Sequence, residues 1–206
     1  MPTLAPSKIV CVGRNYAAHA RELGNDVPTQ PLLFLKPPSS IIRSGESIRL
    51  PTVSKHVEYE GEVGVVISRR LRKATAEAAR DAIGFLVAAN DVTARDLQKS
   101  EPQWTRAKGF DTFCCVGEMG PVPEDLSTLA VTTTVNGTPR QHGKASNMVF
   151  DIPTLLAYIS QCMTLEPGDL VLTGTPEGVG TLAPGDVVEI EIAGVSRTSN
   201  PVEAES

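Results

Sequence analysis

The segment 56–67 constrains this chain more than any other part of the sequence. In it Glu58, Glu60 and Glu62 alternate with uncharged residues, and only valine, glycine and isoleucine follow. This period of two predicts one β-strand from Glu58 to Ile67, in which side chains two positions apart share a face. Like charges side by side on a strand repel one another unless something neutralises them. Carboxylate oxygens suit a hard divalent cation, so the pattern indicates a metal site; the alternative is an acidic strand face in solvent.

The composition is typical of a soluble globular protein. The 206 residues are 41% hydrophobic and 21% charged, which suits a single domain over residues 1–206. No apolar run is long enough to span a membrane, and no secretory signal opens the chain. The four cysteines lack zinc-site spacing and are expected to be reduced thiols, which favours a cytoplasmic location. The net charge of -5 gives no reason to expect nucleic acid as a partner.

Short strands outnumber helices in the predicted order of elements, and they do not alternate as in a βαβ fold. We therefore predict a β-rich α+β fold. The predicted strands are 8–13, 32–35, 58–67, 83–89, 131–135, 170–173 and 187–192, with a hairpin turn at 136–137. The predicted helices are 15–23, 75–82, 93–97 and 152–163. The polar tail 200–206 is expected to be frayed.

Two further positions carry acidic or basic groups that suit catalysis. Asp91 comes just after the predicted strand 83–89, where ligand-binding groups are common, although an Asx turn would explain it too. His19 and Glu22 are three residues apart on a predicted helix and so share a face. A histidine oriented by a carboxylate can act as a general base near neutral pH; the alternative is a surface pair without a role.

Two loops also have suitable chemistry. Lys108 lies between Trp104 and Phe110, and its ammonium group can hold a carboxylate or polarise a carbonyl; the alternative is an ordinary surface lysine. The glycine-rich segment 173–180 follows a strand but lacks the Lys-Ser/Thr ending of a phosphate-binding P-loop. Its backbone N–H groups can still bind a small anion.

Six motifs together resemble the fumarylacetoacetate hydrolase family, over residues 8 to about 202. They are G-R-N-Y-x-x-H-x-x-E at 13–22, P-x-x-F-x-K-P at 31–37, E-x-E at 60–62, D-x-T-x-R-D at 91–96, K-G-F-D-T at 108–112 and L-T-G-T-P-x-G-V-G at 172–180. The resemblance implies a roll of mixed β-sheets with few helices, like the C-terminal domain of these hydrolases. It also implies assembly as a homodimer.

The resemblance assigns roles within the site. Glu60, Glu62 and Asp91 would bind one Mg²⁺ or Mn²⁺, and Glu58 would lie outside the direct ligands. The remaining matches are His19 and Glu22 as the base that activates water, Lys108 as the group that stabilises an enolate, and Arg14, Asn15, Lys36, Gln98 and Thr175 as substrate-pocket residues.

The function that this resemblance implies is hydrolysis of a C–C bond in an acylpyruvate-type 2,4-dioxo acid, which gives pyruvate and a carboxylic acid. The substrate would be a small 2-oxo acid. Two alternatives share the metal-stabilised enolate: decarboxylation of oxaloacetate, and isomerisation of 2-hydroxymuconate-type dioic acids. A non-catalytic binding module with the same fold is an alternative of another class, which the intact acidic triad disfavours.

Overall fold

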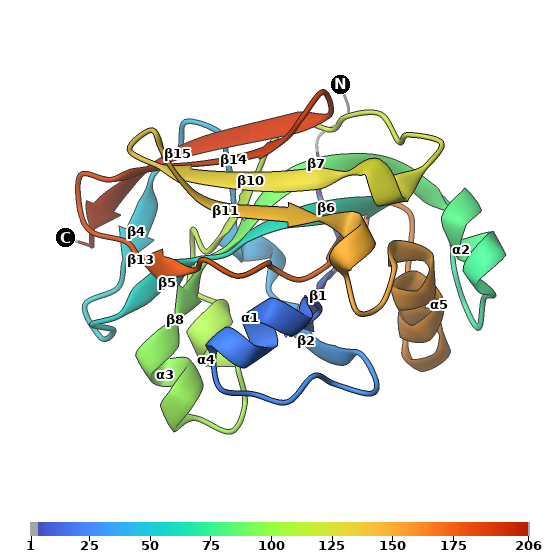
Figure 1. Ribbon diagram of the computed structural model, residues 1–206, viewed down its shortest axis with the longest axis horizontal. Coiled ribbons are helices and arrows are strands. Elements are labelled where there is room, and N and C mark those ends of the chain that lie inside the picture. The colour runs from blue at the N-terminus through green and yellow to red at the C-terminus, as the bar shows by residue number, and fades with distance from the viewer. Residues whose placement is uncertain (1–3, 206) are drawn as a thin grey trace.

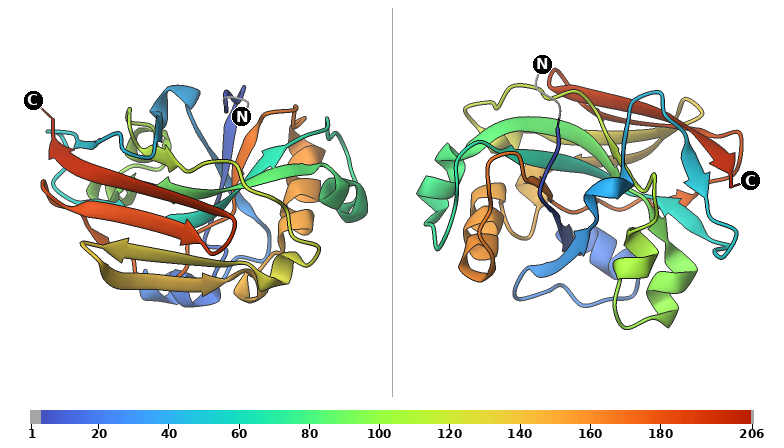
Figure 2. Two further views of the ribbon diagram at one scale, coloured as in Figure 1. Left: turned by 90° about the horizontal axis from the view of Figure 1, so that it is seen from above. Right: turned by 180° about the vertical axis from the view of Figure 1, so that it is seen from behind.

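A curled, mixed sheet of seven strands forms the centre of the fold (Figures 1 and 2). The computed structural model describes residues 4–205. In spatial order the strands are β2 (Leu32–Lys36), β1 (Ile9–Gly13), β12 (Leu170–Leu172), β6 (Gly61–Ile67), β7 (Ile83–Asp91), β9 (Cys114–Val116) and β3 (Ile41–Arg43). Two neighbouring pairs, β1 with β12 and β3 with β9, are parallel. Every residue of β6, in the middle of the sheet, is buried.

A second sheet covers β6 and β7 on one face (Figure 1). Its strands, in spatial order, are β11 (Thr138–Lys144), β10 (Ala130–Val135), β14 (Val187–Ile192), β15 (Ser196–Ala204) and β4 (Ile48–Leu50). Buried and less buried residues alternate along β10 and β14, so one face of each strand points inward. Val131 and Ile190 thereby join the same hydrophobic core as Val63 and Leu86 of the first sheet. The predicted β-rich α+β fold is confirmed.

Two predictions about the second sheet have opposite outcomes. The turn between β10 and β11 is confirmed, because Asn136 and Gly137 both have positive φ angles, of 52° and 74°. The prediction of a frayed tail from residue 200 is wrong, because residues up to Ala204 form β15, which pairs with β14 and β4. Asn200 is fully buried and donates hydrogen bonds from its side chain to two backbone carbonyls.

The predicted single strand from Glu58 to Ile67 is broken at Glu60. The part before the break, β5 (Val57–Tyr59), belongs to a three-stranded sheet with β13 (Gly180–Thr181) and β8 (Thr93–Ala94). The backbone N–H of Glu60 donates to the Asn90 side chain (2.9 Å), and its carbonyl accepts from the N–H of Asp91 (2.8 Å). The break therefore ties Glu60, the first glutamate of the E-x-E motif, to the end of β7.

The helices are short and lie at the margins of the sheets (Figure 1). They are α1 (Ala17–Glu22), α2 (Ala76–Asp81), α3 (Arg95–Ser100), α4 (Thr105–Lys108) and α5 (Ile152–Cys162), with 3₁₀ turns η1 (Pro38–Ser40), η2 (Leu126–Thr128) and η3 (Ala145–Asn147). Thr75 caps α2 as the sequence predicts, whereas α4 was not predicted. Within residues 4–205, no helix is both long and apolar enough to cross a membrane.

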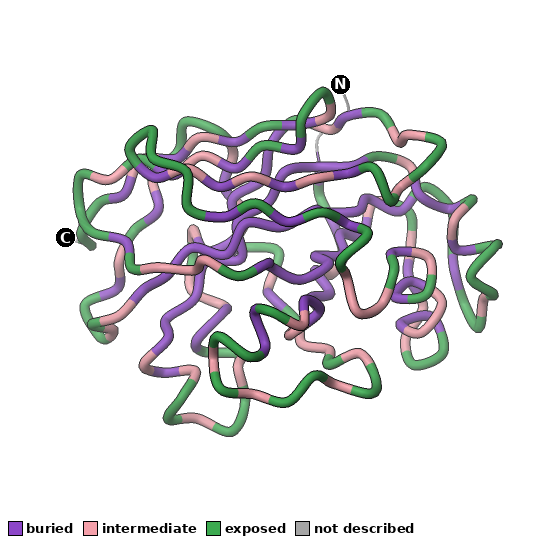
Figure 3. The backbone as a smooth tube through the Cα atoms, viewed as in Figure 1, coloured by how far each residue is buried: buried purple, intermediate pink, exposed green. Residues whose placement is uncertain are grey.

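Burial is concentrated in the middle of the molecule (Figure 3). The central strands β6 and β7 are mostly buried, and the exposed residues are concentrated in loops, hairpin tips and outer helix faces. Charged side chains in the buried region are therefore exceptional and point to a site.

Candidate active site

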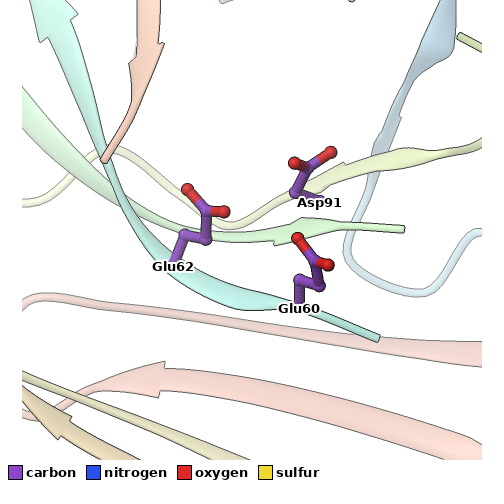
Figure 4. Close-up of side chains that lie close together, drawn as sticks. All are labelled: Glu60, Glu62 and Asp91. Atoms are coloured by element: carbon purple, nitrogen blue, oxygen red, sulfur yellow. The ribbon is translucent and has the colours of Figure 1, made fainter. Parts of the chain in front are cut away.

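Three buried carboxylates face one another where β6 and β7 lie side by side. Glu60, Glu62 and Asp91 each offer an oxygen, and these three oxygens lie within 4.8 Å of one another. Figure 4 shows their carboxylates directed toward one shared space. Glu60 and Glu62 share a face because they are two residues apart, and Asp91 reaches the same face from the end of β7. The three residues are 5%, 1% and 0% exposed, so their mutual repulsion is not screened by solvent.

Gly61, between the two glutamates, lets the other face of this segment approach the second sheet. A Cβ atom at this position would lie only 2.1 Å from Oγ1 of Thr133 on β10. The absence of a side chain at position 61 therefore allows close packing behind the carboxylates.

Buried cations neutralise two of the three carboxylates. Nζ of Lys108 lies 2.7 Å from Glu60 and 2.6 Å from Asp91, and Nζ of Lys36 lies 2.6 Å from the other oxygen of Asp91. Arg95 lies 2.5 Å from Glu60. Burial alone would raise the pKa of Glu60, but Lys108 and Arg95 hold that pKa well below its usual range. Burial would likewise lower the pKa of Lys108, but Asp91 and Glu60 raise it, so the lysine stays charged.

Glu62 has no cation within ion-pair distance among the described residues. Its carboxylate accepts a hydrogen bond from the backbone N–H of Gly174 (2.6 Å). Burial, together with Asp91 and Glu60, raises the pKa of Glu62 well above its usual value. A divalent cation would supply the positive partner that Glu62 lacks. Three carboxylate oxygens are a suitable donor set for Mg²⁺ or Mn²⁺.

His19 and Glu22 form a hydrogen-bonded pair on α1. Nδ1 of His19 lies 3.1 Å from a carboxylate oxygen of Glu22, whose other oxygen accepts from the backbone N–H of Gly178 (3.0 Å). An ionised carboxylate only accepts hydrogen bonds, so Nδ1 carries the proton and Nε2 remains available as a base. The predicted anion-binding N–H groups of segment 173–180 thus hold two carboxylates of the chain itself, those of Glu62 and Glu22.

A narrow cavity of about 40 Å³ lies between His19 and the acidic triad, and it has room for an ion and a few waters. It is lined by Val12, Gly13, Arg14, His19, Leu23, Asn25, Phe34, Glu60, Glu62, Asp91, Arg95, Gln98, Trp104, Lys108 and Thr175. Phe34 and Trp104 form an apolar wall, with ring centroids 5.3 Å apart. The guanidinium of Arg14 lies over the Trp104 ring, 5.9 Å from its centroid.

The comparison with known protein families agrees with this arrangement. The profile described as fumarylacetoacetate (FAA) hydrolase C-terminal matches residues 8–203. The chain belongs to this family. The resemblance predicted from the six motifs is therefore confirmed, and the protein is a fumarylacetoacetate hydrolase family enzyme.

Relatives within the family have different named activities. A mitochondrial oxaloacetate tautomerase FAHD1 of Arabidopsis thaliana is 44% identical over 203 residues, covering 96% of this chain and 91% of the relative. A mitochondrial oxaloacetate decarboxylase of Dictyostelium discoideum is 44% identical over 196 residues, covering 91% and 89%. The structure of a 5-carboxymethyl-2-hydroxymuconate delta-isomerase from Mycobacterium smegmatis is similar with a TM-score of 0.91 and 43% identity, over 98% of this chain and 81% of that chain.

The substrate-pocket residues implied by the family fall into two groups. Arg14, Gln98 and Thr175 line the cavity. The side chain of Asn15 instead bonds to the backbone of Thr173 and Phe150, and Lys36 bonds to Asp91 and a carbonyl. Neither Asn15 nor Lys36 lines the cavity, so both brace the walls of the site in this structure, and their contact with a substrate stays a prediction.

Sequence reasoning missed several members of this hydrolase-family site, among them Arg95 and Trp104. Arg95 is 2% exposed and joins Glu60 to Gln98, although it stood in the D-x-T-x-R-D motif without a role. A cation four residues after Asp91 was the available signal. Trp104 gave no such signal, because its contact with Phe34 joins segments far apart in the sequence.

Proposed function

We propose that this family member converts a small 2-oxo dicarboxylate such as oxaloacetate, by tautomerisation or decarboxylation, at a divalent-metal site. The named activities of the Arabidopsis and Dictyostelium relatives support an oxaloacetate-type substrate. Acylpyruvate hydrolysis, the function first implied by the resemblance, is the second candidate.

The observation that supports the proposal most is that the positive charge of Arg14 has no carboxylate partner among the described residues. Lys36, Lys108 and Arg95 are each paired with carboxylates of the site, whereas no carboxylate lies within ion-pair distance of Arg14 among the described residues. Arg14 lines the cavity, half-buried beside Trp104, with a left-handed φ of 58°. A planar guanidinium in this setting suits a ligand carboxylate. A dicarboxylate offers one carboxylate near the acidic triad and another to Arg14.

The acidic triad of Glu60, Glu62 and Asp91 would hold the divalent cation, which supplies a Lewis acid for the 2-oxo group and for negative charge on it. Lys108 adds a second positive charge at the same place. The Phe34–Trp104 wall keeps bulk water away from that charge.

His19 is the proton carrier of the proposed reaction. In tautomerisation Nε2 removes a proton from C3, the C2–C3 bond becomes double, and the proton is returned to the 2-oxo oxygen. In decarboxylation the C3–C4 bond breaks, carbon dioxide leaves, and the resulting enolate is protonated at C3 by a proton that Nε2 of His19 takes up from water. Glu22 orients the imidazole for either step.

One observation favours the second candidate. The His19–Glu22 pair is also suited to activate a water molecule, which hydrolysis of an acylpyruvate needs and decarboxylation does not. The distal group of acetylpyruvate is an uncharged ketone, so it gives Arg14 no ionic partner.

A substrate comparison tests the proposal. The intact protein is assayed with Mg²⁺ or Mn²⁺ on oxaloacetate, by enol absorbance and by carbon dioxide release, and on acetylpyruvate. We expect Arg14→Gln to lower kcat/KM on oxaloacetate by about 10–100-fold, the scale of a lost charged hydrogen bond, with a much smaller effect on acetylpyruvate. Arg106→Gln, at an exposed position on α4, is the matched control. Faster turnover of acetylpyruvate than of oxaloacetate by the wild type would support the hydrolase instead.

A further inference from the structure

The guanidinium of Arg95 is divided among three side chains. Its Nε donates to Glu58 (2.7 Å), one terminal nitrogen to Glu60 (2.5 Å) and the other to Gln98 (2.5 Å). The group is planar and its donors have fixed directions, so the bond at Nε fixes where the two terminal nitrogens point. Arg95 thereby couples Glu58 to a predicted metal ligand and to a cavity-lining amide.

Glu58 is held from both sides. One of its oxygens accepts from Arg95, and the other lies 2.8 Å from Nε2 of His56. The Glu58 side chain is only 10% exposed, whereas the His56 side chain is 42% exposed. A continuous series of contacts therefore runs from the surface at His56 through Glu58 and Arg95 to Glu60.

We propose that Glu58 is a positioning residue for the metal site, an inference that rests on the proposed binding of a divalent cation by Glu60. The charge of Glu58 holds part of the Arg95 guanidinium away from Glu60. Without that charge, Glu60 is the one carboxylate left for a buried cation that cannot lose its proton. Arg95 then binds Glu60 more tightly and competes with the metal ion for its oxygens.

His56 orients Glu58 for this role. Its contact leaves a single oxygen of Glu58 facing Arg95. Because His56 is at the surface, its own contribution is small, and His56→Ala is expected to change metal affinity by less than about fivefold.

The test measures Mn²⁺ affinity by titration calorimetry on the whole chain, with the unfolding temperature measured alongside. Glu58→Gln keeps the size of the side chain and removes its charge, so we expect Mn²⁺ to bind about 10–100-fold more weakly. Glu58→Asp keeps the charge and should restore most of the affinity. Asp169→Asn breaks a partly buried ion pair with Lys8, elsewhere in the fold, and serves as the control for a general loss of stability.

The outcomes are distinct. Wild-type affinity in Glu58→Gln would overturn the proposal, as would equal weakening in Glu58→Asp or in Asp169→Asn. A wild-type chain that binds no Mn²⁺ would overturn the metal site itself, and the role of Glu58 with it.

Discussion

Glu62 differs from Glu60 and Asp91 because no lysine or arginine among the described residues forms an ion pair with it. Asp91 contacts two lysines, and Glu60 contacts a lysine and an arginine. Glu62 contacts the backbone N–H of Gly174 instead, and its pKa is raised. Two of the three carboxylates are thus part of a buried ion-pair network, whereas the third has no positively charged partner among the described residues.

This difference predicts different effects on stability for two substitutions that both remove a predicted metal ligand. Asp91→Asn leaves the buried Lys36 without a carboxylate partner and Lys108 with Glu60 alone, so it should lower the free energy of unfolding by roughly 3 kcal/mol. Glu62→Gln removes a carboxylate that no cation neutralises, so the free energy of unfolding without metal should be unchanged or slightly higher. Denaturant titration in the presence of a chelator gives both values. A large loss in Glu62→Gln would contradict this account of the charges.

The residues of the site were predictable to different degrees. The spacing of Glu60 and Glu62 places them on one face of any extended segment, and the structure does so. Asp91 alone was better explained by an Asx turn, and the family motif was needed to group it with the glutamates. The three-way sharing of Arg95 was not predictable, because it depends on how β5, β8 and α3 meet in space.

At the scale of elements, the break at Glu60 shows that an alternating sequence pattern does not reveal which sheet a strand joins. The period of two continues through the break, because the chain on both sides is extended. What changes is the pairing: β5 pairs with β13 and β8, and β6 with β7 and β12. Such partners lie far away in the sequence, so a local pattern predicts strands but not the sheet to which each belongs.

Asp169 joins the starts of β1 and β12, the parallel pair beside β6. It accepts hydrogen bonds from the backbone N–H groups of Ser7, Lys8 and Glu166, and it pairs with the Lys8 ammonium. Burial alone would raise the pKa of Asp169, but the bonds from Lys8 and Ser7 hold it below its usual value. The ionised carboxylate therefore stabilises the folded chain.

The sign of this effect makes it dependent on pH. Because the pKa of Asp169 is lower in the folded chain than the roughly 3.9 of an unfolded aspartate, its stabilisation is present above that value and is lost as the pH falls through the folded pKa. We expect Asp169→Asn to lower the free energy of unfolding by about 2 kcal/mol at pH 7. In acid the difference from wild type should shrink. A difference that stays constant down to pH 3 would show that the charge of Asp169 does not matter.

At the scale of the whole molecule, the C-terminal segment contributes to the fold. Asn200 and Val202 are buried and alternate with the less buried Pro201 and Glu203, and β15 joins β4 to the rest of its sheet. A chain that ends at Ser199 loses this burial and the Asn200 hydrogen bonds, so its free energy of unfolding should fall by roughly 4 kcal/mol. A chain that ends at Ala204 keeps both and is the control; equal stability of the two would refute this role for the tail.

The overall fold class followed from the sequence, and the family followed from motifs spread along nearly the whole chain. The packing of the second sheet on β6 and β7 could not be predicted from the sequence, because it depends on contacts between strands that are far apart in the chain. Homodimer formation stays a prediction, which light scattering of the purified chain would test. The identity of the metal ion is a prediction as well.

The most direct test of the account is a crystal structure of the protein grown with Mn²⁺, with anomalous scattering collected at the manganese edge. The account predicts one strong peak per chain, in contact with an oxygen from each of Glu60, Glu62 and Asp91. Anomalous density elsewhere, or none at these carboxylates with Mn²⁺ in excess, would contradict it.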